Sequence, residues 1–279
     1  MKAFNPWLWL LLAGYGPGMA DARLQLLPGT EPQRVFAGEA RKVAVTWHNA
    51  GDISASADVH TLLYQASSVT ATPLSPKVWK TIEILPRQTV LESAPMDFPA
   101  VNVETRFLIQ WQEDTHHVLG NTEVLVYPTN LLGELNSLFG KDILGVLDPD
   151  NELKPLLRQN SVSFIDLAET GLEDFRGRLA IIGPFSTKAQ RREGLTPTIR
   201  KIAGKGVAVV WIQPLSEPKD QIQPSFYIVP EGKAPVVVVQ ADLVANPAGN
   251  PQAQLNLVYF CRLALNPAPF SLPDLKAQP

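Results

Sequence analysis

Residues 143–167 read ILGVLDPDNELKPLLRQNSVSFIDL, and this stretch decides the fold of the second half of the chain. It opens with an apolar run at 143–147, and a Pro-led segment at 149–159 then carries leucines at helical spacing. A second apolar run follows at 162–165. Strands without polar alternation are typical of parallel sheets, which are covered on both faces. The stretch therefore predicts strand, helix and strand, the repeating unit of an α/β domain.

The same pattern continues downstream. Further apolar runs predict strands at 179–182, 207–212, 226–229 and 235–239. Capping residues predict helices from 129 or 130 to 138, from 196 to 202 and from 250 to 265. We expect residues 129–265 to form a three-layer α/β domain with a mostly parallel sheet, containing a surface loop at 214–224. A loosely packed tail would follow at 266–279.

In the first half of the chain the apolar residues recur at every second position, the spacing of half-buried strands. Residues 42–49 (KVAVTWHN) alternate through Val43, Val45 and Trp47, and residues 103–111 (VETRFLIQW) alternate through Val103, Phe107, Ile109 and Trp111. Further strands are expected at 58–64, 78–85, 89–93 and 123–127. About seven strands in about 100 residues are typical of an immunoglobulin-like β-sandwich, here over residues 23–128.

Residues 1–22 carry the features of a cleavable export signal. Lys2 supplies a basic start, residues 7–13 (WLWLLLA) an apolar core, and Ala20-Asp21-Ala22 a small-residue cleavage site. The apolar run is shorter than the roughly 20 residues of a membrane anchor. We expect an exported protein, periplasmic or secreted, with no membrane span after cleavage.

Charge and cysteine content narrow the function further. The chain has 24 basic and 27 acidic residues, a balance that gives no electrostatic footprint for nucleic acid. Cys261 is the single cysteine, so no intrachain disulfide can form. It shares one predicted helical face with Leu257, Val258 and Leu265, which favours a buried, unreactive thiol.

Three segments carry a family resemblance. ILGVLDPDNELKPLLRQNSVSFIDL, LEDFRGRLAIIGP and IRKIAGKGVAVVWIQ resemble the class I glutamine amidotransferase-like fold, which shares the flavodoxin-like layering. The non-catalytic version found as a trimerisation domain in β-galactosidases is the most similar. Upstream, AGEARKVAVTWHNAGD resembles CARDB-like immunoglobulin-fold modules. The first resemblance implies work connected with glycans.

The chain departs from the catalytic pattern of that family. Catalytic members place a Cys nucleophile on a sharp turn and activate it with His. Here Cys261 lies in a predicted helix, and all four histidines, His48, His60, His116 and His117, precede residue 128. A G-x-S-x-G serine motif is missing from the sequence as well. We therefore expect no catalytic residues, no metal and no cofactor.

Polar residues nevertheless follow the predicted parallel strands. Ligands of open α/β sheets bind outside the carboxyl ends of the strands. The candidate ligand-binding residues at those ends are Asp148, Asp150, Asp166, Ser186, Thr187 and Gln213. Gathered carboxylates could hold a hard cation or act as an acid/base pair. The competing interpretation is helix capping, which fits Asp148, Asp150 and Ser186 or Thr187.

The histidine pair and the tryptophans have structural interpretations. His116 and His117 would point to opposite faces of a strand, which favours a solvated hairpin over a metal site. Trp47 and Trp111 are in phase with apolar neighbours and are expected in the core. Trp79 could be buried or could face solvent as a carbohydrate platform, and the sequence leaves both open.

These observations predict an exported, non-catalytic binding or assembly protein associated with glycan processing. Its partner would be a glycan, an envelope protein or a second copy of the chain in a homo-oligomer. The alternative is an envelope hydrolase that uses the strand-end carboxylates, with or without a metal. The distances among Asp148, Asp150 and Asp166 separate the two hypotheses.

Overall fold

The computed structural model describes residues 24–66, 71–74, 76–113, 117–139, 143–183, 195–213 and 225–267. Contacts divide them into two compact units, 24–33 with 42–96 and 106–124, and 34–41 with 97–105 and 125–267. The predicted export signal, the loop at 214–224 and most of the tail lie outside the described residues and stay predictions. Among the described helices, none has the length and apolar character that a membrane span requires.

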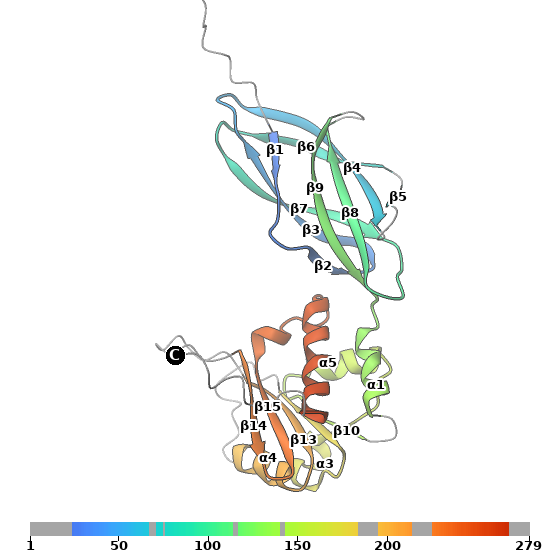
Figure 1. The fold of residues 1–279 in the computed structure, drawn as a ribbon, viewed down its shortest axis with the longest axis vertical. Coiled ribbons are helices and arrows are strands. Elements are labelled where there is room, and N and C mark those ends of the chain that lie inside the picture. Colours follow the sequence, from blue (N-terminus) through green and yellow to red (C-terminus); the bar gives the residue numbers. More distant parts are fainter. Residues whose placement is uncertain are drawn as a thin grey trace, which may run out of the picture. The chain divides into compact units, whose positions relative to one another are not determined.

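Nine strands come first among the described residues (Figure 1). They are β1 (Leu24–Leu27), β2 (Gln33–Phe36), β3 (Gly38–Asn49), β4 (Ala55–Ala66), β5 (Ala71–Pro73), β6 (Lys77–Ile84), β7 (Thr89–Phe98), β8 (Thr105–Gln112) and β9 (Val118–Tyr127). One sheet has the order β1-β3-β7. The other has the order β2-β9-β8-β4-β5, with β6 also paired to β4. The short strands β1, β2 and β5 were not predicted.

The two sheets contact each other through tryptophan. Trp47 of β3 and Trp111 of β8 are both fully buried, and their rings meet nearly at right angles with centroids 5.8 Å apart. This arrangement confirms that both side chains belong to the core. Val103 was expected in the same buried phase, but that prediction was wrong. It is 69% exposed because β8 begins only at Thr105.

A β-bulge decides the position of Trp79. In the pairing of β4 with β6, Val59 faces Lys80 and His60 faces Val78, so Trp79 is the extra residue. The bulge directs its half-buried ring onto Trp111, with centroids 5.1 Å apart, and stacks it against Trp47. Trp79 is therefore part of an aromatic cluster with Trp47 and Trp111, and its ring is half-buried.

The later elements form a third sheet with helices. The strands are β10 (Leu144–Leu147), β11 (Phe164–Asp166), β12 (Leu179–Ile182), β13 (Ala208–Gln213), β14 (Phe226–Glu231) and β15 (Ala234–Gln240). The helical segments are η1 (Leu131–Gly133), α1 (Glu134–Phe139), α2 (Leu153–Gln159), α3 (Leu167–Thr170), η2 (Leu172–Asp174), α4 (Leu195–Gly204), η4 (Ala241–Val244) and α5 (Pro251–Leu265). The strand order is β11-β10-β12-β13-β15-β14, parallel except for β14.

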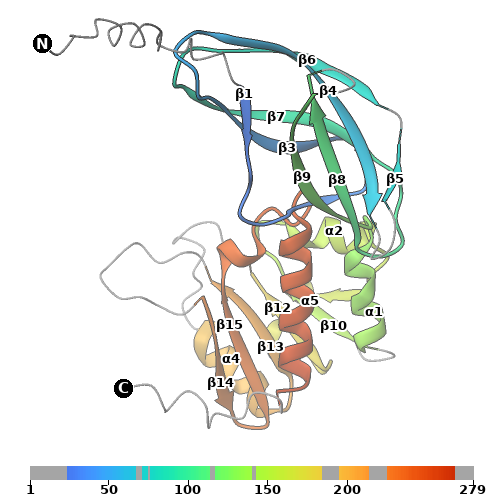
Figure 2. The same ribbon diagram turned by 45° about the horizontal axis from the view of Figure 1, so that its top comes forward.

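Alternating side chains of this sheet enter two separate cores. Leu179 and Ile181 of β12 join a cluster that contains apolar residues of α1, α2 and α5. Ala180 and Ile182 join a cluster with residues of α3 and α4. Helices therefore cover both faces, with α5 on one side and α4 on the other (Figure 2). This double burial explains the continuous apolar runs of the sequence.

The structure tests two local predictions, the start of helix α2 and the burial of Cys261. Helix α2 begins at Leu153 and not at residue 149, because residues 149–150 form a turn and Asn151 has a left-handed backbone with φ of 55°. Cys261 is completely buried in α5, and burial raises the pKa of its thiol. The expectation of a buried thiol is confirmed.

Candidate functional site

The predicted ligand-binding residues are spread along the carboxyl ends of the parallel strands. Asp148 follows β10, Asp166 is the last residue of β11, and Gln213 is the last residue of β13. Between β10 and β12 the strand order reverses direction, which is where open α/β sheets place their ligands. Ser186 and Thr187 fall outside the described residues.

Asp148 caps a helix. Its side chain is buried, and one carboxylate oxygen accepts the backbone N–H groups of Leu153 and Lys154 at 2.7 and 2.8 Å. The other oxygen accepts the N–H of Glu152 at 3.2 Å. Three of the unpaired donors at the start of α2 are thus satisfied by one carboxylate. The capping interpretation is therefore the one that the structure supports for Asp148.

Asp166 is also bound within the fold. One carboxylate oxygen accepts the N–H of Ala168 at 3.0 Å and caps α3. The other lies 2.8 Å from Lys154 Nζ, in a pair whose side chains are only 16% and 11% exposed. The hydrogen bond from Lys154 is the main reason that the pKa of Asp166 lies below its ordinary value. Asp166 is therefore an ionised structural group, unsuited to act as a general acid.

Asp150 does not complete a metal site with these carboxylates. It lies partly exposed in the turn after β10 and makes an interaction of its own. Among the described residues, no three His, Cys, Asp or Glu side chains are placed to hold a metal ion. The two caps therefore account for Asp148 and Asp166 without a ligand.

Gln213 belongs to a different part of the sheet. It lines a hollow of about 250 Å³ on the α4 side, together with Arg200 of α4, Trp211 of β13 and Tyr227 of β14. In the parallel register Gln213 stands opposite Gln240 of β15. Because β10 and β11 lie on the other side of β12, Gln213 does not share one site with Asp148 and Asp166.

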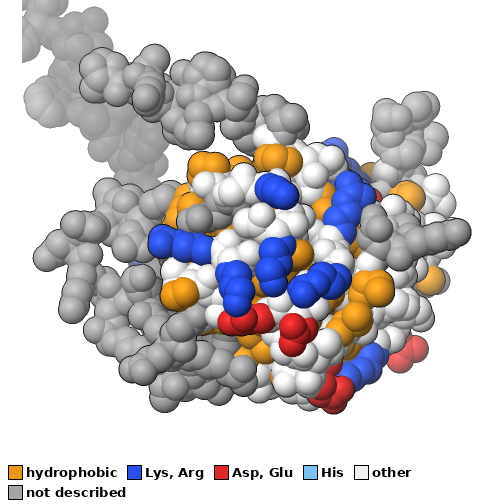
Figure 3. Space-filling view, turned by 90° about the horizontal axis from the view of Figure 1, so that it is seen from below, with side chains coloured by type: hydrophobic (Ala, Val, Ile, Leu, Met, Phe, Trp, Pro, Cys, Tyr) orange, Lys and Arg blue, Asp and Glu red, His pale blue; other side chains and the backbone are white. Residues whose placement is uncertain are grey.

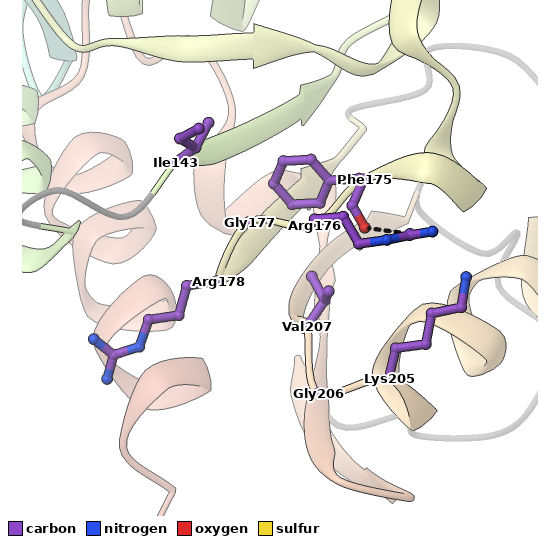
Figure 4. A pocket seen from close by; sticks show the side chains of 8 residues that line it. All are labelled: Ile143, Phe175, Arg176, Gly177, Arg178, Lys205, Gly206 and Val207. Carbon is purple, nitrogen blue, oxygen red and sulfur yellow. Dashed lines mark hydrogen bonds between the residues drawn. The ribbon is translucent and has the colours of Figure 1, made fainter.

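A larger hollow lies at the opposite ends of the strands. It has a volume of about 460 Å³ and is lined by Ile143, Phe175, Arg176, Gly177, Arg178, Lys205, Gly206 and Val207 (Figure 4). Ile143 directly precedes β10, Arg178 precedes β12, and Val207 precedes β13. Figure 3 shows this end of the sheet, where Lys and Arg side chains gather, with fewer acidic side chains at the margin of the group.

Glycine shapes the wall of this basic hollow. A Cβ atom on Gly177 would lie 2.1 Å from the carbonyl oxygen of Ile143 and 2.2 Å from the ring of Phe175. No other residue fits at this close approach. The chain on either side presents Arg176 and Arg178, whose side chains extend in different directions in Figure 4.

Two of the cations converge on one oxygen atom. Arg176 Nη1 and Lys205 Nζ each donate to the backbone carbonyl of Glu173 at 3.0 Å, so the two nitrogens are at most 6.0 Å apart. Arg176 Nη1 also donates to the carbonyl of Phe175 at 3.1 Å. Two unit charges at this separation repel by somewhat less than about 1 kcal/mol in water, and by more where solvent is displaced.

The carboxylate of Glu173 forms an ion pair outside the lining of the hollow. The side chain of Glu173 is paired with Lys201 of α4. The hydrogen bond from Lys201, followed by the charges of Lys201 and Lys205, lowers the pKa of Glu173. Glu173 is therefore ionised, and its ion pair is with Lys201. Three cationic side chains, those of Arg176, Arg178 and Lys205, therefore line the hollow.

Sequence reasoning missed this hollow because it searched only the carboxyl ends of the strands. The available signal was the pair of segments FRGR, at residues 175–178, and GKG, at 204–206, each placed directly before a predicted strand. All strands of a parallel sheet begin at the same edge, so these cations come close together once β12 pairs with β13.

No family model and no curated protein matches the chain. Among solved structures, a mutant β-glucosidase from Listeria innocua bound to laminaribiose is 16% identical over 39% of this chain and 17% of its own, with a TM-score of 0.30. An alkylpurine DNA glycosylase from Pseudomonas fluorescens bound to DNA is 13% identical over 38% of this chain and 31% of its own, with a TM-score of 0.29. A β-glucosidase from Streptomyces venezuelae in complex with D-glucose is 17% identical over 38% and 15%, with a TM-score of 0.27. This chain spans less than a third of each, and likenesses this weak assign neither fold nor activity.

Proposed function

We propose that the protein is an exported binding or assembly protein, built from an immunoglobulin-like β-sandwich and an amidotransferase-like α/β domain that has no catalytic role. The observation that carries this proposal is the capping of α2 by Asp148. Its two carboxylate oxygens accept three backbone N–H groups in a buried position. A carboxylate fixed in this way is poorly placed to bind a metal or to accept a proton from substrate.

Two further groups that a hydrolase could use, Asp166 and Cys261, are also engaged within the fold. Asp166 is held ionised by Lys154, and Cys261 is buried in α5 with its pKa raised. Thiolate chemistry requires an accessible thiol with a lowered pKa. These contacts favour binding over the alternative of an envelope hydrolase that uses the strand-end carboxylates.

Activity and binding assays on residues 23–279 test the proposal together. We expect no turnover of chromogenic glycosides, esters or amides above the buffer blank. A glycan array with the same preparation tests the ligand class that the β-galactosidase resemblance implies. Turnover that disappears in a folded Asp166→Asn variant would overturn the proposal and establish the hydrolase.

A further inference from the structure

We infer that the basic hollow before β10, β12 and β13 binds a phosphate group carried by a small organic ligand. This inference rests on the proposed binding function and names a ligand class for it. Its basis is the convergence of Arg176 and Lys205 on the carbonyl oxygen of Glu173, at the wall of a 460 Å³ hollow.

Helix electrostatics explain only part of this charge. Lys201 and Lys205 lie at the end of α4, where the helix dipole favours cations. Arg176 and Arg178 come from the segment between η2 and β12 and gain nothing from that helix end. Three cationic side chains from two separate segments therefore line one hollow, and Glu173, the acidic neighbour described above, is paired with Lys201.

The donors suit a doubly charged oxyanion. Arg176 uses one terminal nitrogen on the carbonyls of Glu173 and Phe175, which holds its guanidinium beside Lys205 (Figure 4). Guanidinium and ammonium groups on one side of a hollow match the several oxygens of a phosphate better than the single charge of a carboxylate. A dianion would also relieve the repulsion between the two cations.

The size of the hollow indicates that the phosphate is attached to a larger body. The volume exceeds that of an inorganic ion, and Ile143 adds apolar surface to the cationic walls, whereas Phe175 and Val207 are almost fully buried. Ile143 is 50% exposed, at the rim of the hollow. A phosphorylated sugar presents both a dianion and a ring with apolar faces, and therefore fits this lining.

Isothermal titration calorimetry with glucose 6-phosphate, inorganic phosphate and glucose tests the inference on residues 23–279. We expect saturable binding of glucose 6-phosphate, weaker binding of inorganic phosphate and none of glucose. Tighter binding of inorganic phosphate than of the sugar phosphate would overturn the organic part of the inference. Binding should weaken at least tenfold in the double variant Arg176→Gln with Lys205→Gln.

The matched control is Arg262→Gln, which removes a cation of α5 that pairs with Glu134 and does not line the hollow. It should bind glucose 6-phosphate within twofold of the unchanged chain. Lys205→Arg, which keeps the charge, should bind within about threefold and guards against a folding defect in the double variant. Absence of saturable binding, or equal loss in Arg262→Gln, would overturn this site while leaving the binding function intact. Release of phosphate from the ligand would instead contradict the non-catalytic function.

Discussion

Lys154 joins the two carboxylates that the sequence offered as a catalytic pair. Its backbone N–H donates to Asp148 at 2.8 Å, and its side-chain Nζ lies 2.8 Å from Asp166. The start of α2 is thereby connected to the end of β11 through one residue. Both acids are thus engaged in contacts within the fold, one with the backbone and one with the side chain of Lys154.

Asp148→Ala should destabilise the protein by about 2 kcal/mol, because three backbone N–H groups at the start of α2 lose their acceptor in a buried position. Urea denaturation followed by circular dichroism measures this free energy. Glu169→Ala, an exposed change in α3, is the control and should stay within about 0.5 kcal/mol. Equal stability of Asp148→Ala and the unchanged chain would refute the capping role.

Lys154→Met should lower stability in a manner that depends on pH. The folded pKa of Asp166 is depressed, so its contribution is present above the unfolded pKa of about 3.9 and is lost as pH falls through the folded pKa. We expect a difference of about 1–2 kcal/mol between the two chains at pH 7. Denaturation at a series of pH values should show this difference shrinking below about pH 4. A difference that is constant with pH would contradict the ion pair.

Gly177→Ala should destabilise the protein by about 2–3 kcal/mol, since the added Cβ would overlap the carbonyl oxygen of Ile143 and the ring of Phe175. Gly204→Ala provides a matched control. No atom lies within 4 Å of its added Cβ at the end of α4, and alanine favours helix, so this variant should be neutral or slightly more stable. Thermal unfolding of the two variants side by side makes the comparison.

Cys261 should not react with a thiol reagent such as Ellman's reagent in the folded protein at pH 8. Burial removes access to the thiol and raises its pKa, so the thiolate is scarce. The same reagent should label the thiol completely in 6 M guanidinium chloride. Rapid labelling under native conditions would show that α5 opens readily or packs differently.

Some elements of the fold were predictable from the sequence and others were not. The run at 207–212 predicted β13, and the capping pair Asn250-Pro251 predicted α5, because burial on both faces and helix capping leave strong local patterns. Strands β1 and β2 were missed because each has only four residues, and of these eight residues one alone is buried. The bulge at Trp79 depends on pairing with a distant strand, which a local pattern does not record.

The candidate site was predictable only in part. Capping by Asp148 was one of two interpretations open from the sequence, and its three N–H contacts now favour it. The contact of Lys154 with Asp166 joins residues on different elements, and its closeness follows from the pairing of β10 with β11. The meeting of Arg176 with Lys205 likewise requires β12 to lie beside β13, a tertiary fact.

A turnover assay with a folded Asp166→Asn variant beside the unchanged chain tests the central claim most directly. Circular dichroism first shows that both preparations are folded. The account predicts that neither preparation hydrolyses glycoside, ester or amide substrates faster than the buffer blank. Substrate turnover by the unchanged chain that falls at least a hundredfold in Asp166→Asn would contradict it.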